Sequence, residues 1–164
     1  MKQEKFLTIY AVLDEESQQY LTKLQNEILK NYPNGTQTMG IPFHISLGSF
    51  PLDKKEELLE RMAKIQKLSK PSMIELLGLG HFNHQVIFAQ PRITEELQFL
   101  HQSFEGNYSD GFPWMPHITL YCGKEEDGIE ILKQYNLSLK KSFIIGLELG
   151  EFFPTKILAN CKFE

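Results

Sequence analysis

The chain has 164 residues, a formal net charge of −4 at pH 7 and a sequence pI near 5.8. This length is typical of one domain with a substantial core, and the acidic balance excludes the broad basic surface that follows a long nucleic acid. We therefore expect a single domain over residues 1–164 and, if a nucleic acid is bound, a nucleotide, a short oligomer or a chain end.

Strands and helices alternate along the chain. Strands are predicted over residues 6–13, 43–50, 72–79, 85–90, 142–149 and 155–163, with a further short strand beginning at residue 117. Loops over 31–42 and 105–116 precede the second strand and the strand that begins at 117. Helices are predicted between the first and second strands, between the second and third strands, and between the fourth strand and the loop at 105, while a turn over 80–84 joins the third and fourth strands.

Capping residues mark the helix starts. Asp14 and Thr94 each precede an apolar pattern with helical spacing and are predicted N-caps. Asp53 and Glu56 have the spacing of a capping box, which predicts that a helix begins there and ends before the third strand. A short helix is predicted over 125–135.

The two halves of the chain share an internal repeat. Residues 70–90 align with residues 140–160 at a constant offset of 70, and nine of the 21 positions are identical. A long period that occurs twice indicates a duplicated lobe rather than a solenoid. We therefore predict an α+β fold in which a β-α-β-α-β-β unit occurs twice, over residues 1–83 and 84–164, forming two pseudo-symmetric lobes with antiparallel sheets around a central cleft.

A repeated tetrapeptide carries the chemical signal. His44-Ile45-Ser46-Leu47 returns 73 residues later (117 − 44) as His117-Ile118-Thr119-Leu120. Because side chains alternate between the two faces of a strand, the histidine and the hydroxyl residue of each motif share one face while the aliphatic residues enter a core. The spacing predicts that both polar faces meet across the cleft. Neutral and protonated imidazoles are a general base and a general acid near pH 7.

On these two tetrapeptides, their separation and the order of strands and helices, the whole chain resembles the two-histidine phosphoesterase superfamily, which contains 2′-5′ RNA ligases and 2′,3′-cyclic phosphodiesterases. Ser46 stands where threonine is commoner in the family, and it keeps the hydroxyl. The resemblance implies an enzyme that hydrolyses or ligates a nucleotide-type phosphodiester without a metal or cofactor. It implies His44 and His117 as catalytic residues, Ser46 and Thr119 as phosphate-binding residues, and a nucleotide or short RNA with a 2′,3′-cyclic phosphate or 2′-5′ linkage as partner.

Further residues are candidates for substrate contacts. Tyr121 falls on the same strand face as His117 and is a candidate to line the cleft. Phe112 and Trp114 in the preceding loop either stack on a base or hold the loop down as a hydrophobic latch. His81 and His84 lack the further ligands of a zinc site, so ordinary turn residues are the favoured interpretation.

Two alternatives to catalysis stay open on sequence grounds. One is a nucleotide-binding module on the same fold that performs no catalysis, and the other is an interaction protein with an empty cleft.

Cys122 and Cys161 are isolated, the apolar stretches are shorter than a membrane span, and the N-terminal pattern differs from a signal peptide. We therefore expect a cytoplasmic protein without membrane contact, with a monomer as the favoured state.

Overall fold

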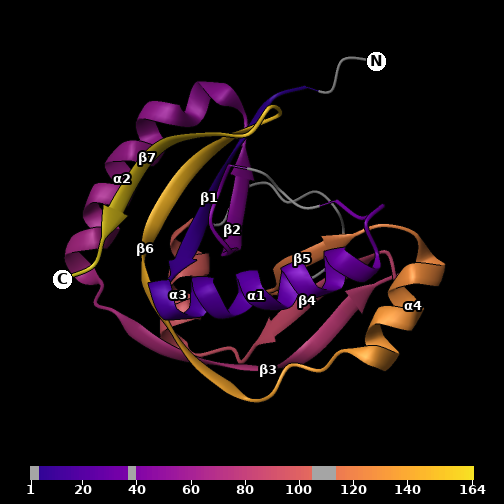
Figure 1. Ribbon diagram of the computed structural model, residues 1–164. Coiled ribbons are helices and arrows are strands. Elements are labelled where there is room, and N and C mark those ends of the chain that lie inside the picture. Colours follow the sequence, from indigo (N-terminus) through magenta and orange to yellow (C-terminus); the bar gives the residue numbers. More distant parts are fainter. Residues whose placement is uncertain (1–3, 37–39, 105–113) are drawn as a thin grey trace.

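The computed structural model describes residues 4–36, 40–104 and 114–164 of the chain (Figure 1). The strands are β1 (Phe6–Leu13), β2 (His44–Phe50), β3 (Ser72–Phe82), β4 (Val86–Pro91), β5 (Ile118–Cys122), β6 (Lys140–Phe152) and β7 (Lys156–Lys162). The helices are α1 (Glu15–Asn31), α2 (Lys55–Leu68), α3 (Glu95–Ser103) and α4 (Glu125–Gln134), with a 3-10 turn η1 (Leu52–Lys54) before α2. Among these described helices, none is long and apolar enough to cross a membrane.

The strands form one antiparallel sheet that β6 carries through both lobes. The order is β2-β1-β6-β3-β4-β5, and β7 also pairs with β6. The long β6, which curves across the molecule in Figure 1, pairs with β3 near its start, with β7 toward its end, and with β1 along most of its length. The α+β fold with antiparallel pairing is confirmed. The repeat boundary between residues 83 and 84 stays a prediction.

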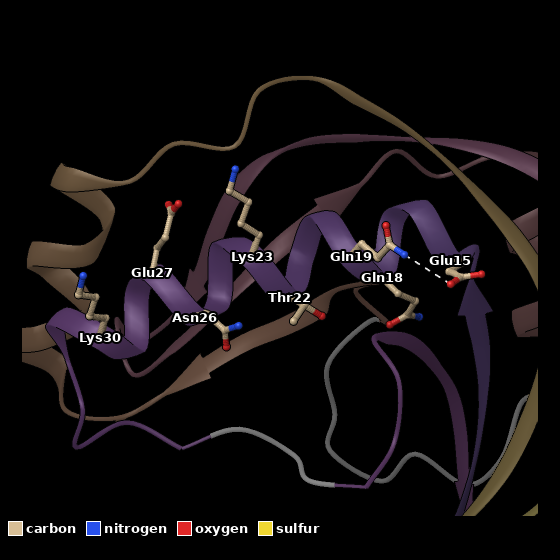
Figure 2. A pocket seen from close by; sticks show the side chains of 8 residues that line it. All are labelled: Glu15, Gln18, Gln19, Thr22, Lys23, Asn26, Glu27 and Lys30. Atoms are coloured by element: carbon tan, nitrogen blue, oxygen red, sulfur yellow. Dashed lines mark hydrogen bonds between the residues drawn. The ribbon is translucent and has the colours of Figure 1, made fainter.

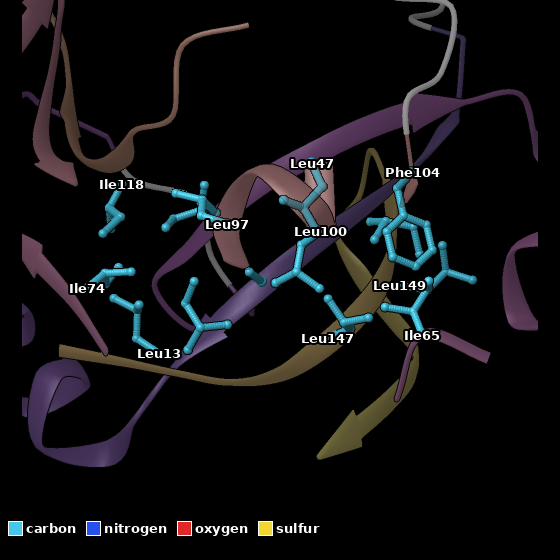
Figure 3. Close-up of a cluster of buried hydrophobic side chains, with 14 of the residues drawn as sticks. Leu13, Leu47, Ile65, Ile74, Leu97, Leu100, Phe104, Ile118, Leu147 and Leu149 are labelled. Carbon is cyan, nitrogen blue, oxygen red and sulfur yellow. The ribbon is translucent and has the colours of Figure 1, made fainter. Parts of the chain in front are cut away.

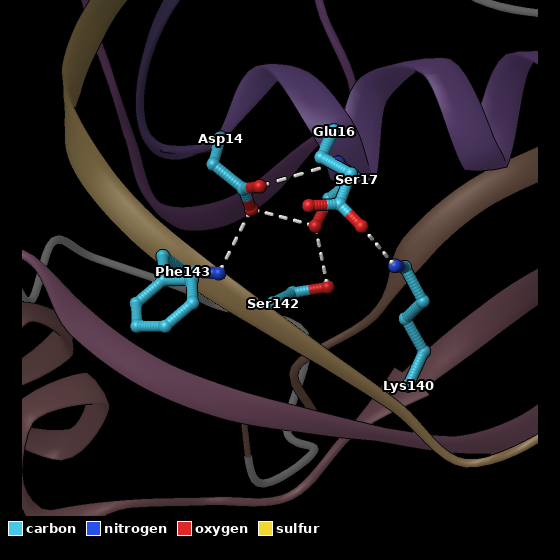
Figure 4. Close-up of polar contacts among 6 residues, drawn as sticks. All are labelled: Asp14, Glu16, Ser17, Lys140, Ser142 and Phe143. Atoms are coloured by element: carbon cyan, nitrogen blue, oxygen red, sulfur yellow. Dashed lines mark hydrogen bonds and ion pairs between the residues drawn. The ribbon is translucent and has the colours of Figure 1, made fainter.

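Asp14 joins the start of α1 to β6. The sequence predicts that Asp14 caps the helix, but it does not predict the contact with β6. One carboxylate oxygen of Asp14 accepts from the Ser17 backbone N–H at 3.3 Å, and the other accepts from the Phe143 N–H at 2.9 Å and the Ser17 hydroxyl at 2.6 Å. The Ser17 hydroxyl also donates to the Ser142 hydroxyl at 2.7 Å (Figure 4). Burial alone would raise the pKa of Asp14, but these hydrogen bonds outweigh it and hold that pKa below its ordinary value.

The two other predicted helix starts have different outcomes. Thr94 caps α3 through a hydrogen bond from the Leu97 N–H, as predicted. The capping box at Asp53 is wrong, because the chain after Pro51 first makes the turn η1, and α2 then begins at Lys55 without a side-chain cap. Asp53 therefore lies inside the turn, one position too early to satisfy the first N–H groups of the helix.

The aliphatic residues of both motifs are buried in the hydrophobic core. Ile45, Leu47, Ile118 and Leu120 are fully buried in a cluster that also contains residues of α2 and α3 (Figure 3). A second cluster joins the end of α1 to α4 and the second lobe. The motif strands are thus fixed from their apolar side, which leaves their polar faces to build a site.

Candidate functional site

The motif histidines and hydroxyls lie on the faces that the alternation predicts. His44, Ser46, His117 and Thr119 are half-buried, whereas the intervening aliphatic side chains are fully buried. The strands β2 and β5 stand at opposite ends of the strand order and nevertheless contact each other, because the sheet curves round. His44 and Thr119 consequently line the same pocket of about 300 Å³.

Both imidazoles are anchored in the same way. Nδ1 of His44 bonds the carbonyl of Pro42 at 2.8 Å, and Nδ1 of His117 bonds the carbonyl of Met115 at 2.9 Å. A carbonyl oxygen only accepts, so each Nδ1 carries the proton of the neutral ring. Each Nε2 is therefore the ring nitrogen that exchanges a proton at the site.

An aromatic ring on the neighbouring strand packs against each histidine. The centroid of the Tyr10 ring lies 4.5 Å from that of His44. The centroids of Phe82 and Phe88 lie 4.9 Å and 5.4 Å from that of His117. Tyr10 and Phe88 have equivalent places, since Tyr10 is paired in register with Ser46 and Phe88 with Thr119.

The surroundings of His44 favour its neutral form. Burial lowers the pKa of His44, the hydrogen bond to Pro42 opposes this in part, and charge on His117 lowers the pKa further. The last effect requires the two imidazoles to lie within electrostatic range of each other. A neutral imidazole with Nδ1 already donating presents Nε2 as a proton acceptor.

Helix α1 holds the two motif strands through a pair of amides that are two helical turns apart (25 − 18 = 7 residues). Gln18 donates to the Phe43 carbonyl and accepts from the Phe43 N–H, both at 2.8 Å. Gln25, which is buried, donates to the Leu120 carbonyl at 2.7 Å. The same helix therefore fixes the residue before His44 and the residue after Thr119.

The α1 amides also form the wall of the pocket beside His44. The full lining of this pocket is Gln18, Thr22, Gln25, Asn26, Gly40, Ile41, Pro42, Phe43, His44 and Thr119. A larger hollow of about 670 Å³ continues along the exposed side of α1 and shares three of these residues (Figure 2). Figure 2 shows that its wall comes from this one helix, with Lys23 and Glu27 extended away from the motif strands, so it is an open helix face.

Trp114 has the environment of a latch. Its half-buried indole donates from Nε1 to the Ser46 carbonyl at 3.0 Å, and its ring stacks on His101 with centroids 3.8 Å apart. One face of the indole is thus occupied by protein, and the contact ties the segment before His117 to β2. Phe112, the other aromatic candidate in this loop, lies outside the described residues.

Tyr121 does not lie where the alternation predicts. Its side chain is fully buried with Ile28, Ile87 and Ile131, and its hydroxyl donates to Asp127 at 3.5 Å. The cause is an irregularity in the pairing of β4 with β5. Phe88 is opposite residue 119 but the preceding residue of β4 is opposite residue 121, so the two-residue alternation is broken between them.

The remaining histidines have local contacts. The His84 backbone N–H donates to Nδ1 of His81 at 3.2 Å, and the His84 ring, in the turn after β3, stacks on the His81 ring near the end of that strand. His101 stacks on Trp114, as described above. Across residues 4–36, 40–104 and 114–164, no three metal-binding side chains gather in one place.

Comparison with known proteins agrees with this architecture. The family model described as "2'-5' RNA ligase superfamily" matches residues 13–143. Among solved structures, the Thermus thermophilus protein TT0787 superposes with a TM-score of 0.67 at 18% identity, covering 96% of this chain and 97% of that one. E. coli LigT complexed with NADP+ superposes with a TM-score of 0.64 at 13% identity, covering 98% and 99%. A search of curated proteins gave no match.

The chain belongs to the 2′-5′ RNA ligase superfamily, since the family model spans most of its length. The structural likenesses, at these identities, establish the shared fold. Membership supports an activity of the two-histidine phosphoesterase or ligase type on a nucleotide phosphodiester.

Proposed function

We propose that this protein hydrolyses, or reversibly ligates, a nucleotide-type phosphodiester by paired histidine general acid–base catalysis without a metal. The preferred bond is a 2′,3′-cyclic phosphate or a 2′-5′ linkage. The observation that carries the proposal is the matched tethering of His44 and His117, whose Nδ1 atoms both bond a backbone carbonyl two residues earlier. This arrangement supplies two Nε2 atoms whose tautomer is fixed, in strands that contact each other.

The two histidines have different roles in hydrolysis. Nε2 of His44 takes a proton from the attacking water, a role that suits a ring whose pKa burial lowers. The water oxygen bonds to phosphorus as one ribose oxygen leaves, and His117 gives that oxygen a proton. Ligation reverses these roles. Each proton transfer contributes on the order of 10² to 10⁴ in rate.

The motif hydroxyls bind the non-bridging phosphate oxygens in this scheme. Ser46 and Thr119 share strand faces with His44 and His117, and hydroxyl donors stabilise charge that grows on phosphate oxygens during displacement. E. coli LigT, which shares the fold, has been crystallised with phosphate, 3′-AMP, ATP and NADP+. Those complexes are consistent with a nucleotide-type ligand for the present chain.

A substrate panel tests the proposal. The protein is incubated with the four nucleoside 2′,3′-cyclic monophosphates and with 2′-5′-linked dinucleotides, with and without EDTA, and products are separated by chromatography. The His44→Ala/His117→Ala double variant, purified identically, controls for contaminating enzymes. The proposal expects turnover that EDTA leaves intact and the double variant lacks. Binding without turnover would favour the non-catalytic nucleotide-binding module, and neither binding nor turnover would favour the interaction protein.

A further inference from the structure

A buried polar row crosses the first lobe beside the motif hydroxyl. Ser46, Tyr10 and Glu148 are paired in register on the adjacent strands β2, β1 and β6. Residues paired in this way point to the same face of an antiparallel sheet, so all three share the face of His44. Two strand spacings separate the ends of the row, which places Glu148 about 10 Å along the sheet from Ser46.

Both groups beyond Ser46 are buried, and of the two the Tyr10 hydroxyl is the one fully enclosed without a partner among the described residues. Tyr10 is 0% exposed and Glu148 is 8% exposed. Within the described part of the chain, the Tyr10 hydroxyl has no hydrogen-bond partner, and no hydrogen bond or ion pair joins the Glu148 carboxyl to another described residue. Burial raises the pKa of both groups, and the nearby Glu148 charge adds to the effect at Tyr10. Unsatisfied buried polar groups cost stability, so they call for an explanation.

The second lobe shows that packing alone does not require these polar atoms. Phe88 supports His117 in the place where Tyr10 supports His44, and at the repeat offset of 70 the counterpart of Glu148 on β3 is Gly78 (148 − 70). The equivalent position thus has a ring without a hydroxyl and a partner without a carboxyl. The hydroxyl of Tyr10 and the carboxyl of Glu148 are additions to the repeated frame, found in one lobe only.

The Tyr10 ring extends toward β6 over a glycine. A Cβ atom at Gly150 would lie 3.1 Å from Cε1 of Tyr10 and 3.5 Å from its hydroxyl oxygen. The phenol end therefore lies above β6, on the strand that carries Glu148. The hydroxyl and the carboxyl consequently lie on the same face of the sheet as His44, and the Tyr10 ring packs against the ring of His44.

We propose that Tyr10 and Glu148 form a subsite that binds the nucleoside of the substrate through its N–H or O–H donors. The inference rests on the proposed function, because the phosphate at His44 and Ser46 sets where the nucleoside begins. A part of the substrate that reaches Tyr10 and Glu148 lies beyond the phosphate, and in a nucleotide that part is the nucleoside. The carboxylate accepts from ribose hydroxyls or from base N–H groups, and the phenol supplies one donor and one acceptor.

Binding of product-like ligands tests the subsite without requiring turnover. Affinities for inorganic phosphate and for the 3′-monophosphates of adenosine, cytidine, guanosine and uridine are measured by calorimetry with wild-type protein, Tyr10→Phe and Glu148→Gln. Matched controls are Tyr121→Phe, a buried tyrosine of the second cluster, and Glu151→Gln, which pairs opposite Leu7 on the other sheet face.

The expected result separates nucleoside from phosphate. Each subsite variant should weaken nucleotide binding about tenfold, the effect of one lost hydrogen bond to a charged or buried group, and leave phosphate binding unchanged. Both controls should bind like wild type. A penalty equal for all four bases assigns the donors to ribose, and an unequal penalty assigns them to the base.

Other outcomes overturn the subsite. These are unchanged nucleotide affinity in both variants, an equal loss for phosphate and nucleotide, or wild-type protein that binds nucleotides no more tightly than phosphate. Tyr10→Phe should also unfold at the same or a higher temperature than wild type without ligand, and a lower temperature would reveal a structural partner for the hydroxyl. Failure of the proposed function is a separate result, because it is absence of turnover in the panel, whatever these affinities are.

Discussion

His44 and His117 share one mode of attachment, in which each ring donates from Nδ1 to the carbonyl of the residue two positions before it. Both carbonyls lie in the segments that lead into β2 and β5, and a proline is part of each segment (Pro42 and Pro116). The backbone therefore selects the tautomer and orientation of both rings before any substrate binds. Such preorganisation is the property that general acid–base catalysis requires of its groups.

The first prediction concerns the acid limb of the pH profile. His44 must be neutral to accept a proton, and burial lowers its pKa. The acid limb of kcat/KM for a substrate from the panel should therefore fall below about pH 6.5, the ordinary histidine value. Initial rates from pH 4.5 to 9, with an NMR titration of the His44 ring in the same buffers, check this. A limb at or above 6.5 would assign the base to a group other than buried His44.

The second prediction concerns the amide that α1 places on the second motif strand. Gln25→Leu removes the donor to the buried Leu120 carbonyl, which should lower the free energy of unfolding by about 1 to 3 kcal/mol. The neighbouring Thr119 loses its fixed position, so kcat should fall more than substrate affinity does. Gln19→Leu, on the exposed side of α1, is the matched control and should change neither quantity. Equal behaviour of the two variants would show that Gln25 does not position the strand.

The third prediction concerns the latch at Trp114, the single tryptophan of the chain. Trp114→Phe loses the hydrogen bond to the Ser46 carbonyl and should cost about 1 kcal/mol in the free energy of unfolding, while KM changes less than about twofold. Denaturant unfolding followed by circular dichroism and steady-state kinetics measure the two effects. Unchanged stability with a KM raised more than about fivefold would mean that the indole contacts the substrate instead.

The fourth prediction concerns the cap at Asp14. Asp14→Ala should lower the free energy of unfolding at pH 7 by about 1 to 2 kcal/mol, because the helix cap and the bond from the Phe143 N–H are both lost. A carboxyl whose folded pKa lies below its ordinary value of 3.8 stabilises above that value, and the contribution disappears as the pH falls through the folded pKa. The difference between wild type and variant should therefore shrink below pH 3.8.

Asp53→Ala is the control for the cap, since the structure places Asp53 inside η1 rather than at the N-cap of α2. Its effect should stay within about 0.5 kcal/mol, as for an exposed surface residue. A loss as large as that of Asp14→Ala would restore the capping box that the sequence predicts. A pH-independent difference for Asp14→Ala would show that its carboxylate charge is not what stabilises the fold.

The sequence predicted what depends on local patterns. Alternation in His44 to Leu47 and in His117 to Leu120 assigned the buried and polar faces, and Asp14 and Thr94 marked their helices because capping involves residues three positions apart. Tyr10 was not among the predicted site residues, although the alternation of Thr8 and Tyr10 with aliphatic neighbours in β1 is a signal that could have found it.

Contacts and strand pairings between distant parts of the chain could not be predicted from the sequence. The contact of Gln25 with Leu120 spans 95 residues, and no local pattern encodes it. Tyr121 was misplaced because a pairing irregularity in β5 breaks the alternation, and nothing in the motif announces it. The turn η1 displaced the start of α2, and the spacing of Asp53 and Glu56 does not reveal this, because it matches a capping box whether or not a turn precedes the helix.

The most direct test of the account is the turnover of the single variants His44→Ala and His117→Ala on the substrate that the panel identifies. Each should lose at least about 10²-fold in kcat while unfolding cooperatively near the wild-type temperature, and the double variant should lose little more than either single one, because residues that act as a unit are not additive. Ser46→Ala and Thr119→Ala should each lose about 2 to 4 kcal/mol of transition-state stabilisation. Near wild-type turnover in either single histidine variant would contradict the two-histidine mechanism.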